Sequence, residues 1–540
     1  MDTNGSSITR RTFIRGGLGT ALAAAGVGLT ACGGPSDAGG TDVPSDTGEP
    51  KVLRFGVSNP KVTFDTQKTS NDVGVSEAVA EALVNMDPDT KEIYPVLLTT
   101  LPSVSSDGLT YSFTLKDDVK FHNGETLKSS DVKYTLTRMF LPETKATSID
   151  SFVYIKGSQD IIDGVATELS GVQVQDDTHF TIELTQPYST FLAMMSEFYA
   201  IIYPEKACTE AGEAWGSGTT FIGTGPFRLE SNDDSTEVVL KAFEDYHEGK
   251  VDLDEVDFVY IDDANTRMLS YKNADIDLAF IDRSLIKTYA ADDDVKDDIV
   301  YYAPASTQFV NLNLKDEKLA DVRVRQALSL AINRREICDT VLSGAAEPAS
   351  CFCPSSESGH DGSYDVLDYD VEKAKSLLAE AGADGLALSA QVRSQDQDLM
   401  VALQDAWSKI GVSCDVQVID NGVWSESRKN GTLQVTLVTW STLCFQGIEH
   451  MGSYFRSDRA AAKSSFYEST VFDALVDEAR QTTDGDSAIA NLAKQADKQL
   501  VRIDYACLPV CWPQMPYALK SDFKGLQVLV NPLFRKVTKG

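Results

Sequence analysis

The chain has 540 residues, of which 42% are hydrophobic and 24% are charged, and its formal net charge at pH 7 is −33. This length is too great for one hydrophobic core, so we expect two or three domains with the composition of an ordinary soluble globular protein. A strongly acidic chain repels phosphate backbones, which excludes nucleic acid as an expected partner.

The N-terminus is expected to be an export signal. It opens with three arginines, Arg10, Arg11 and Arg15, and continues with an uncharged run at 16–31 that is too short to span a membrane comfortably. The arginine pair with Phe13 behind it resembles a twin-arginine signal. Residues 29–32, Leu-Thr-Ala-Cys, resemble a bacterial lipobox, although an apolar N-terminus can also contain a cysteine by chance. We therefore predict a signal peptide at 1–31 and a lipid anchor on Cys32, which would tether the mature protein outside the cytoplasmic membrane.

The stretch after the signal is rich in Gly, Pro, Ser, Thr and acidic residues, so 32–50 is predicted to be a flexible tether. The apolar residues alternate at 51–57, which predicts the first strand. Asn71 or Asp72 is then expected to cap a helix whose buried face consists of Val75, Val79, Ala82, Leu83 and Met86.

A β-rich inserted subdomain is predicted at 95–200. Residues 109–115 alternate apolar and polar after the turn pair Asp107-Gly108, which is typical of a half-buried strand. A helix follows, capped by Ser129 or Ser130. A second hairpin is predicted at 172–174 and 180–184.

From about residue 256 onward, strands alternate with helices, which favours an α/β architecture. Residues 308–314 are unusual because Val310, Leu312 and Leu314 share one face of a strand while Phe309, Asn311 and Asn313 share the other. The predicted elements are strands at 256–260, 276–281, 386–393, 412–419 and 433–440, helices from 321, 370, 399, 471 and 489, and a Pro-rich return strand around 507–517.

No motif for catalysis is found. Residues 223–227, Gly-Thr-Gly-Pro-Phe, lack the Lys-Ser/Thr of a phosphate loop, and Pro226 removes an N–H donor. The five His residues form no zinc-protease motif, and no nucleophile elbow is present. We therefore predict that the chain is not an enzyme and needs no cofactor.

The cysteines leave two alternatives open. Eight remain after Cys32, an even number that permits disulfides in an exported protein, with pairing that sequence does not specify. Cys351 and Cys353 with His360 resemble a metal site, but two close cysteines outside the cell are more often disulfide partners, so no metal is expected. The eight are Cys208, Cys338, Cys351, Cys353, Cys414, Cys444, Cys507 and Cys511.

Several segments in order along the chain resemble the peptide/nickel-type solute-binding proteins (family 5) of ABC importers. The most characteristic is Tyr111-Ser-Phe-Thr-Leu-Lys-Asp-Asp-Val-Lys-Phe-His-Asn-Gly-Glu-Thr-Leu-Lys-Ser-Ser-Asp-Val132. Each segment is weak alone, but together they are specific and span nearly all of the mature chain. The other matching segments are 223–228, 263–267, 275–277, 321–328, 331–333 and 369–378.

The resemblance implies an α/β, bilobal type II periplasmic-binding-protein fold with an additional β-rich subdomain. Lobe I would contain 51–94, 201–307 and 504–540, and lobe II would contain 308–503. It further implies a periplasmic or cell-surface transport receptor, anchored to the membrane by lipid and expected to be a monomer. Such a receptor captures a peptide or other small solute between its lobes and delivers it to ABC permease subunits.

The resemblance also suggests ligand-binding residues. A Trp at the position of Trp440 lines the cleft in the family, and Arg393 ends a strand where a peptide binder places an Arg for the ligand carboxylate. Phe309, Asn311 and Asn313 are predicted to line the cleft near the lobe crossover. Ser58 and Asn59 follow the first strand, where α/β folds bind ligands. A core Trp and a solvated Arg are the alternatives for Trp440 and Arg393.

One departure from the family affects the expected ligand. Peptide binders carry an Asp shortly after the Trp, for the peptide amino group, whereas this chain reads Ser-Thr-Leu-Cys-Phe-Gln-Gly-Ile at 441–448 before Glu449. Glu449 would replace the Asp only if the loop is rearranged. The predicted function is therefore capture of a peptide or similar small polar solute. The alternatives are a metal chelate or other non-peptide solute, or a ligand-sensing surface lipoprotein.

Overall fold

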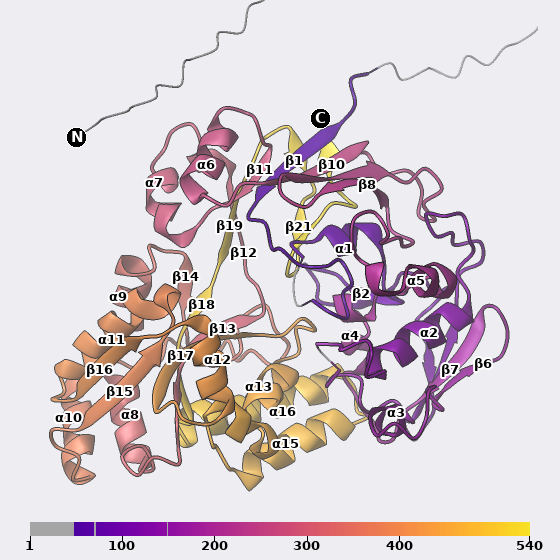
Figure 1. The fold of residues 1–540 in the computed structure, drawn as a ribbon. Coiled ribbons are helices and arrows are strands. Elements are labelled where there is room, and N and C mark those ends of the chain that lie inside the picture. The colour runs from indigo at the N-terminus through magenta and orange to yellow at the C-terminus, as the bar shows by residue number, and fades with distance from the viewer. Residues whose placement is uncertain (1–47, 70–71, 148) are drawn as a thin grey trace, which may run out of the picture. The chain divides into compact units, whose positions relative to one another are not determined.

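The computed structural model describes residues 48–69, 72–147 and 149–540. Residues 50–540 form one compact unit (Figure 1). The predicted signal peptide, Cys32 and most of the predicted tether lie outside the described residues. Within the described ranges, no helix is long and apolar enough to cross a membrane.

A seven-stranded mixed sheet is assembled from distant parts of the chain, in the order β12-β19-β11-β1-β10-β9-β8. β1 lies inside it, parallel to both β10 and β11, with Leu53 and Phe55 buried and Arg54 partly exposed. Phe55 of β1 packs edge-to-face on Phe258 of β10 at 5.7 Å. The strands are β1 (Val52–Val57), β8 (Phe227–Asp233), β9 (Glu237–Ala242), β10 (Glu255–Tyr260), β11 (Leu278–Phe280), β12 (Ile299–Tyr302) and β19 (Met515–Leu519), and the nearby helices are α1 (Val75–Val79), α6 (Ala264–Lys272) and α7 (Ile286–Ala290).

The helix predicted after Asp72 is shorter than expected. α1 ends at Val79, and Val84–Met86 form strand β2, which pairs with β3 (Ile93–Pro95). Helical spacing over this stretch therefore gave the wrong element, because strand pairing overrides local periodicity. The N-cap is Gly74, so the predicted cap at Asn71 or Asp72 is wrong, although the Asp72 carboxylate accepts the N–H of Ser76 at 3.0 Å.

The predicted strands of the inserted region form a four-stranded antiparallel sheet in the order β4-β5-β7-β6. Phe113 of β5 stacks on Phe180 of β7 at 4.9 Å. Helix α2 begins at Ser129 with Lys128 as its N-cap, so the predicted serine cap is wrong by one residue, and Asp131 accepts the N–H of Lys128 instead. The elements are β4 (Ser103–Val104), β5 (Thr110–Thr114), β6 (Val172–Val174), β7 (His179–Glu183), α2 (Ser129–Phe140), α3 (Ser158–Ile162), α4 (Phe191–Met194) and α5 (Glu205–Ala211).

A second mixed sheet has six strands in the order β14-β18-β13-β17-β15-β16. β15 is parallel to β16 and β17, whereas β13 is antiparallel to its neighbours β17 and β18. The strands are β13 (Ser306–Leu312), β14 (Ala346–Pro348), β15 (Ala387–Val392), β16 (Ser413–Val418), β17 (Val435–Ser441) and β18 (Cys507–Pro513).

Helices cover both faces of this second sheet (Figure 1). Val310 and Leu312 pack under one layer and Phe309 under the other, so β13 is buried on both faces. The first layer contains α8 (Val322–Leu330), α9 (Arg334–Thr340), α10 (Val371–Glu380) and α11 (Gln397–Ser408). The second layer contains α12 (Asn421–Lys429), α13 (Gly447–Phe455), α14 (Ser457–Ala460), α15 (Thr470–Gln481) and α16 (Asp486–Lys498).

The chain passes between the two sheets twice. It leaves β12 of the first sheet and enters β13 of the second through 303–305, and it returns from β18 to β19 through Gln514. The predicted single return strand at 507–517 is thus two strands in different sheets. β12 pairs with β19 and β13 pairs with β18, so the two crossings run side by side (Figure 1).

Candidate functional site

The loop 441–446, between β17 and α13, connects three parts of the structure. Thr442 donates its N–H to the carbonyl of Ala305 in the first crossing, at 3.0 Å. Cys444 and Phe445 are buried in the hydrophobic core of the inserted subdomain. Leu443 lines a pocket together with residues of α1, of 196–201 and of the C-terminal segment 527–536. The loop therefore touches the crossing between the two sheets, the core of the subdomain and the wall of this pocket.

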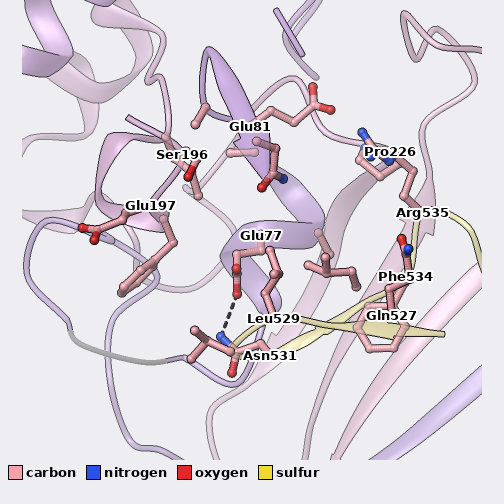
Figure 2. Close-up of a pocket in the computed structure, with 18 of the residues that line it drawn as sticks. Glu77, Glu81, Ser196, Glu197, Pro226, Gln527, Leu529, Asn531, Phe534 and Arg535 are labelled. Atoms are coloured by element: carbon pink, nitrogen blue, oxygen red, sulfur yellow. Dashed lines mark hydrogen bonds between the residues drawn. The ribbon is translucent and has the colours of Figure 1, made fainter. Parts of the chain in front are cut away.

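The pocket beside Leu443 contains carboxyl groups with different partners (Figure 2). Glu81 is satisfied, since it accepts from Thr224 at 3.0 Å and from Tyr246 at 2.7 Å. Glu77 accepts from Asn531 Nδ2 at 2.6 Å. Figure 2 shows the Glu197 carboxylate pointing away from the Glu77–Asn531 pair, and among the described residues it has no hydrogen bond or ion pair.

Burial raises the pKa values of two of these carboxyls. The pKa of Glu77 rises to about 7, through burial first and then through the nearby charge of Asp72, against the hydrogen bond from Asn531. Glu197 is 7% exposed. Its pKa rises to about 8 because of burial and of the nearby charge of Glu449. Both carboxyls thus carry a proton through part of the neutral pH range.

Trp440 lies at the end of β17 and is half-buried. Its indole Nε1 donates to Ser453 Oγ at 3.0 Å, and its ring packs edge-to-face on Tyr454 at 5.1 Å. Lys463 Nζ lies over the indole, 4.3 Å from the ring centroid. The Arg428 guanidinium lies 5.7 Å from the same ring.

A second indole connects Trp440 to Arg393. Arg428 also lies over Trp424, at 4.8 Å, and the Arg393 guanidinium covers Trp424 at 4.4 Å. Trp424 is fixed by its own Nε1, which donates to Thr436 Oγ1 at 2.8 Å. The structure therefore brings the two predicted residues Trp440 and Arg393 into one group with Trp424, Arg428 and Lys463, which we call the cationic–aromatic cluster.

The three cations of the cluster differ in their partners. Arg393 pairs with Asp396 at 2.8 Å. Lys463 Nζ and the Arg428 guanidinium form no ion pair with any described residue, and Arg428 Nε is buried without a hydrogen-bond partner. Burial and then the charge of Arg428 lower the pKa of Lys463 to about 8.

Phe309, Asn311 and Asn313 have structural partners in this conformation. Phe309 is fully buried and contacts Phe352, Tyr454 and Phe455. The amide of Asn311 donates to the carbonyls of Lys463 and Ser464, and the amide of Asn313 to those at 431 and 433. Their side chains order the backbone beneath the cluster, and their contact with ligand stays a prediction.

Ser58 and Asn59 follow β1 in the first sheet, and their hydrogen-bond partners among the described residues lie outside the cluster. Ser58 Oγ accepts from Arg267 Nη1 at 3.0 Å. Asn59 donates its backbone N–H to the Asp262 carboxylate and its side-chain amide to the carbonyl of Asp234. Their role in binding also stays a prediction.

Glu449, the possible replacement for the missing Asp, is already paired. Its carboxylate accepts from Arg480 at 2.7 Å and from Thr190 Oγ1 at 2.9 Å. Glu449 is buried, and the Arg480 side chain is 11% exposed. In this conformation Glu449 therefore joins α13 to α15 and to the inserted subdomain.

The eight described cysteines, 208 to 511, are all free and buried. Cys351 Sγ lies 3.6 Å from His360 Nδ1. Over the described ranges, no group of three or more His, Cys, Asp or Glu side chains is arranged to hold a metal ion.

Sequence reasoning missed Trp424, Arg428, Lys463, Leu443 and Glu197. Trp424 and Arg428 are four residues apart and share a face of α12, but no helix was predicted there, so this signal was not used. Lys463 and Glu197 carried none, since neither belongs to a motif or an amphipathic pattern.

Two α/β sheets joined by two adjacent crossings, with an inserted β subdomain, define a two-lobe binding-protein fold. Comparison with solved structures agrees with this class. A periplasmic murein tripeptide binding protein in its unliganded open form superposes with a TM-score of 0.78 at 22% identity, covering 91% of this chain and 98% of that one. A periplasmic binding protein from Helicobacter pylori in complex with the peptide STSA gives 0.75 at 21% identity, covering 90% and 98%.

The sequence then places the chain in a family. Residues 92–461 match the model of the bacterial extracellular solute-binding proteins, family 5, and the chain belongs to this family. It is therefore a binding protein and not an enzyme. Relatives include a dipeptide-binding protein of Lactococcus lactis, 28% identical over 461 residues (78% of this chain, 80% of the relative). Another is a dipeptide-binding protein of Escherichia coli, 27% identical over 485 residues (84% and 86%).

Proposed function

We propose that this protein is the extracytoplasmic receptor of an ABC importer and that it captures a peptide or a similar small polar solute between its two lobes. Membership of family 5 supports the receptor role. The names of relatives support a peptide, since several are dipeptide- or oligopeptide-binding proteins. The receptor would deliver its solute to permease subunits in the membrane.

The observation that carries this proposal is the position of loop 441–446. Trp440 precedes it, Leu443 lines a pocket with residues of α1 and of 527–536, and the loop contacts the crossing at Ala305. We propose that the two sheets are the cores of lobe I and lobe II and that 303–305 and Gln514 are the hinge. Ligand binding would then close the lobes, because a ligand shifts a conformational equilibrium only if it binds one state more tightly.

Within the cleft we propose Trp440 and Arg393 as the main ligand contacts, with Trp440 supplying an apolar ring. Arg393 is already paired with Asp396, so it would reach a ligand carboxylate by sharing or exchanging that partner. Phe309, Asn311, Asn313, Ser58 and Asn59 remain weaker candidates.

The presence of Leu443 in the pocket favours a second candidate for the ligand, a non-peptide solute. The loop after Trp440 offers a leucine and no free acid to the pocket, and Glu449 is paired with Arg480. Not every structural neighbour holds a peptide: one was solved with agropinic acid.

Native mass spectrometry of gently purified protein, followed by calorimetry with the recovered solute and with defined dipeptides and tripeptides, tests the ligand class. A bound peptide is expected. If the protein retains a metal chelate or another non-peptide and no peptide gives a heat of binding, the ligand class is the second candidate, a non-peptide solute.

Small-angle scattering tests the hinge independently of ligand identity. Saturating solute should compact the protein and raise its melting temperature. A higher melting temperature without compaction would contradict lobe closure while leaving binding intact.

We also propose that Cys32 is acylated and anchors the protein to the membrane, on the basis of the lipobox-like residues 29–32. The variant Cys32→Ala should lose lipid labelling and appear in the soluble fraction. Cys208→Ala, at a buried cysteine far along the chain, is the matched control and should stay membrane-bound. Unchanged membrane association and labelling of Cys32→Ala would contradict the anchor.

A further inference from the structure

The unpaired cations of the cationic–aromatic cluster stand out against the charge of the whole chain. The sequence contains 81 acidic residues and 48 Lys and Arg residues. Other cations of the interior have partners: Arg138 pairs with Asp65 at 2.6 Å and Arg480 with Glu449 at 2.7 Å, whereas Arg325 and Arg334 donate to backbone carbonyls. Arg428 and Lys463 are partly buried neighbours, and among the described residues their charged groups have neither a carboxylate nor a backbone carbonyl as a partner.

Arg428 and Lys463 come from different segments and are held in place by other contacts. Arg428 lies in the last turn of α12, over the faces of Trp424 and Trp440. The backbone of Lys463 is fixed because its carbonyl accepts from Asn311 Nδ2 at 3.2 Å and from the Tyr454 hydroxyl at 3.3 Å. The two like charges are thus positioned before any ligand arrives, which lowers the ordering cost of binding.

The surrounding acids do not neutralise these two cations. Asp396 is taken by Arg393. Asp150 of the inserted subdomain lies near Lys463 but pairs with Arg459 at 2.9 Å. Tyr454, the remaining polar neighbour, is buried, and burial raises its pKa further, so it stays a neutral phenol.

We infer that Arg428 and Lys463 bind an acidic group of the transported solute. This carboxylate is distinct from any carboxylate that Arg393 binds, and the Trp440 indole packs against the apolar stem that carries it. A carboxylate between a guanidinium and an ammonium gains charge-assisted hydrogen bonds from both. The inference rests on the proposed capture of a solute in this cleft and narrows the solute class to acidic peptides or similar polyanionic molecules.

The protonation of Lys463 supports this inference. Burial and the charge of Arg428 lower its pKa to about 8, against the charge of Asp150. At pH 7 the ammonium is still mostly protonated, and a bound carboxylate would remove the repulsion from Arg428 and raise the pKa again.

The test uses synthetic alanine tripeptides that carry one Glu, one Gln or one Lys at each of the three positions. Binding to the purified protein is measured by calorimetry at low salt and at physiological salt. At one position we expect the Glu peptide to bind at least about tenfold more tightly than its Gln counterpart, with the Lys peptide weakest.

Two substitutions and one control assign that preference. Lys463→Gln and Arg428→Gln should each reduce the Glu-over-Gln ratio at least about fivefold, with little change for the Gln peptide. Lys315→Gln is the matched control, because Lys315 is exposed and lies over the Phe466 ring at 4.7 Å without an ion pair to any described residue. It should keep the full ratio. Melting temperatures verify that each variant folds. If Arg428→Gln does not fold, the result for Lys463→Gln alone decides the test.

Two results would overturn the inference. One is peptide binding without a Glu preference, and the other is a preference that survives both substitutions. If no tripeptide binds, peptide capture itself fails, and citrate titrated against tryptophan fluorescence then decides the anion site. A saturable change in wild type that is lost in Lys463→Gln supports the site, whereas no change in wild type rejects it.

Discussion

Two groups of charged side chains lie in the same helical layer of the second sheet, and they differ in whether the charges are paired. Around α13, Glu449 accepts from Arg480 and Thr190, so each charge has a partner. Around Trp440, Arg428 and Lys463 cover indole rings and pair with no described carboxylate. A paired charge fixes a structural contact, whereas an unpaired one can gain free energy when a ligand supplies the opposite charge.

The paired region should be the more sensitive to loss of a charge. Arg480→Met leaves the Glu449 carboxylate buried and unpaired, with Glu197 nearby. We expect the free energy of unfolding to fall by ~3–5 kcal/mol, measured by denaturant titration.

Arg459→Met is the control for this prediction. It breaks an ion pair of the same layer with Asp150, but both side chains are exposed, so its cost should be ~0–1 kcal/mol. Equal small losses in both variants would show that the Glu449–Arg480 pair is not a structural contact.

Trp440→Ala tests the unpaired region. Losing a half-buried ring from a binding surface typically costs ~2 kcal/mol or more in binding, about thirtyfold in affinity. Stability without ligand should fall much less. Trp407 is the core comparison, since it is fully buried and donates to the Leu328 carbonyl at 3.1 Å, and Trp407→Ala should lose ~3–5 kcal/mol of folding free energy. A folding defect in Trp440→Ala with unchanged affinity would remove Trp440 from the site.

Glu197 extends the comparison to an unpaired carboxyl. Its pKa rises from 4.5 to about 8, so the folded protein keeps a proton that the unfolded chain releases. This group's contribution to stability is therefore lost as pH rises from 4.5 to 8.

Glu197→Gln cannot ionise, and it should be ~1–3 kcal/mol more stable than wild type at pH 8 and nearly equal to it at pH 4. Thermal unfolding at both pH values measures the difference. Glu426→Gln, at an exposed position of α12, should change neither value. A Glu197→Gln variant that is less stable at pH 8 would mean that the carboxylate has a partner in solution.

The smallest expected effect is on pH-dependent affinity. The pKa of Lys463 is lowered to about 8, so raising the pH from 7 to 9 removes its charge from the free protein. Affinity for a Glu-containing peptide should fall about tenfold over this range, while Lys463→Gln should show a flat profile by calorimetry. The charged groups that face Lys463 are Arg428, Arg459 and Asp150. A steep profile in Lys463→Gln would assign the effect to a group other than Lys463.

Much of the fold was predictable because its signals are local. The strand predicted at 109–115 is β5, and the alternation at 51–57 is β1, since the period of two survives whichever strands pair. The stretch after Asp72 misled because Ala82, Leu83 and Met86 satisfy helical spacing, whereas Val84–Met86 pair with β3 and only that partner selects the strand.

The candidate site was predictable only in part. Trp440 and Arg393 end two strands of the second sheet, and the family resemblance pointed to both. The role of Phe309, Asn311 and Asn313 stays a prediction. In this conformation they meet ring and backbone partners from 431–464, and sequence alternation does not reveal whether a second layer covers a strand.

By itself, the sequence determined the family, the α/β class, the export signal as a prediction and the order of the main strands, because these depend on motifs and on short-range periodicity. Only the tertiary structure decided that β18 and β19 lie in different sheets and that Glu449 is committed to Arg480. It alone also placed Arg428 and Lys463 beside Trp440 without a carboxylate. Pairing of strands and pairing of charges both depend on which distant residues meet, and no local pattern of residues contains that information.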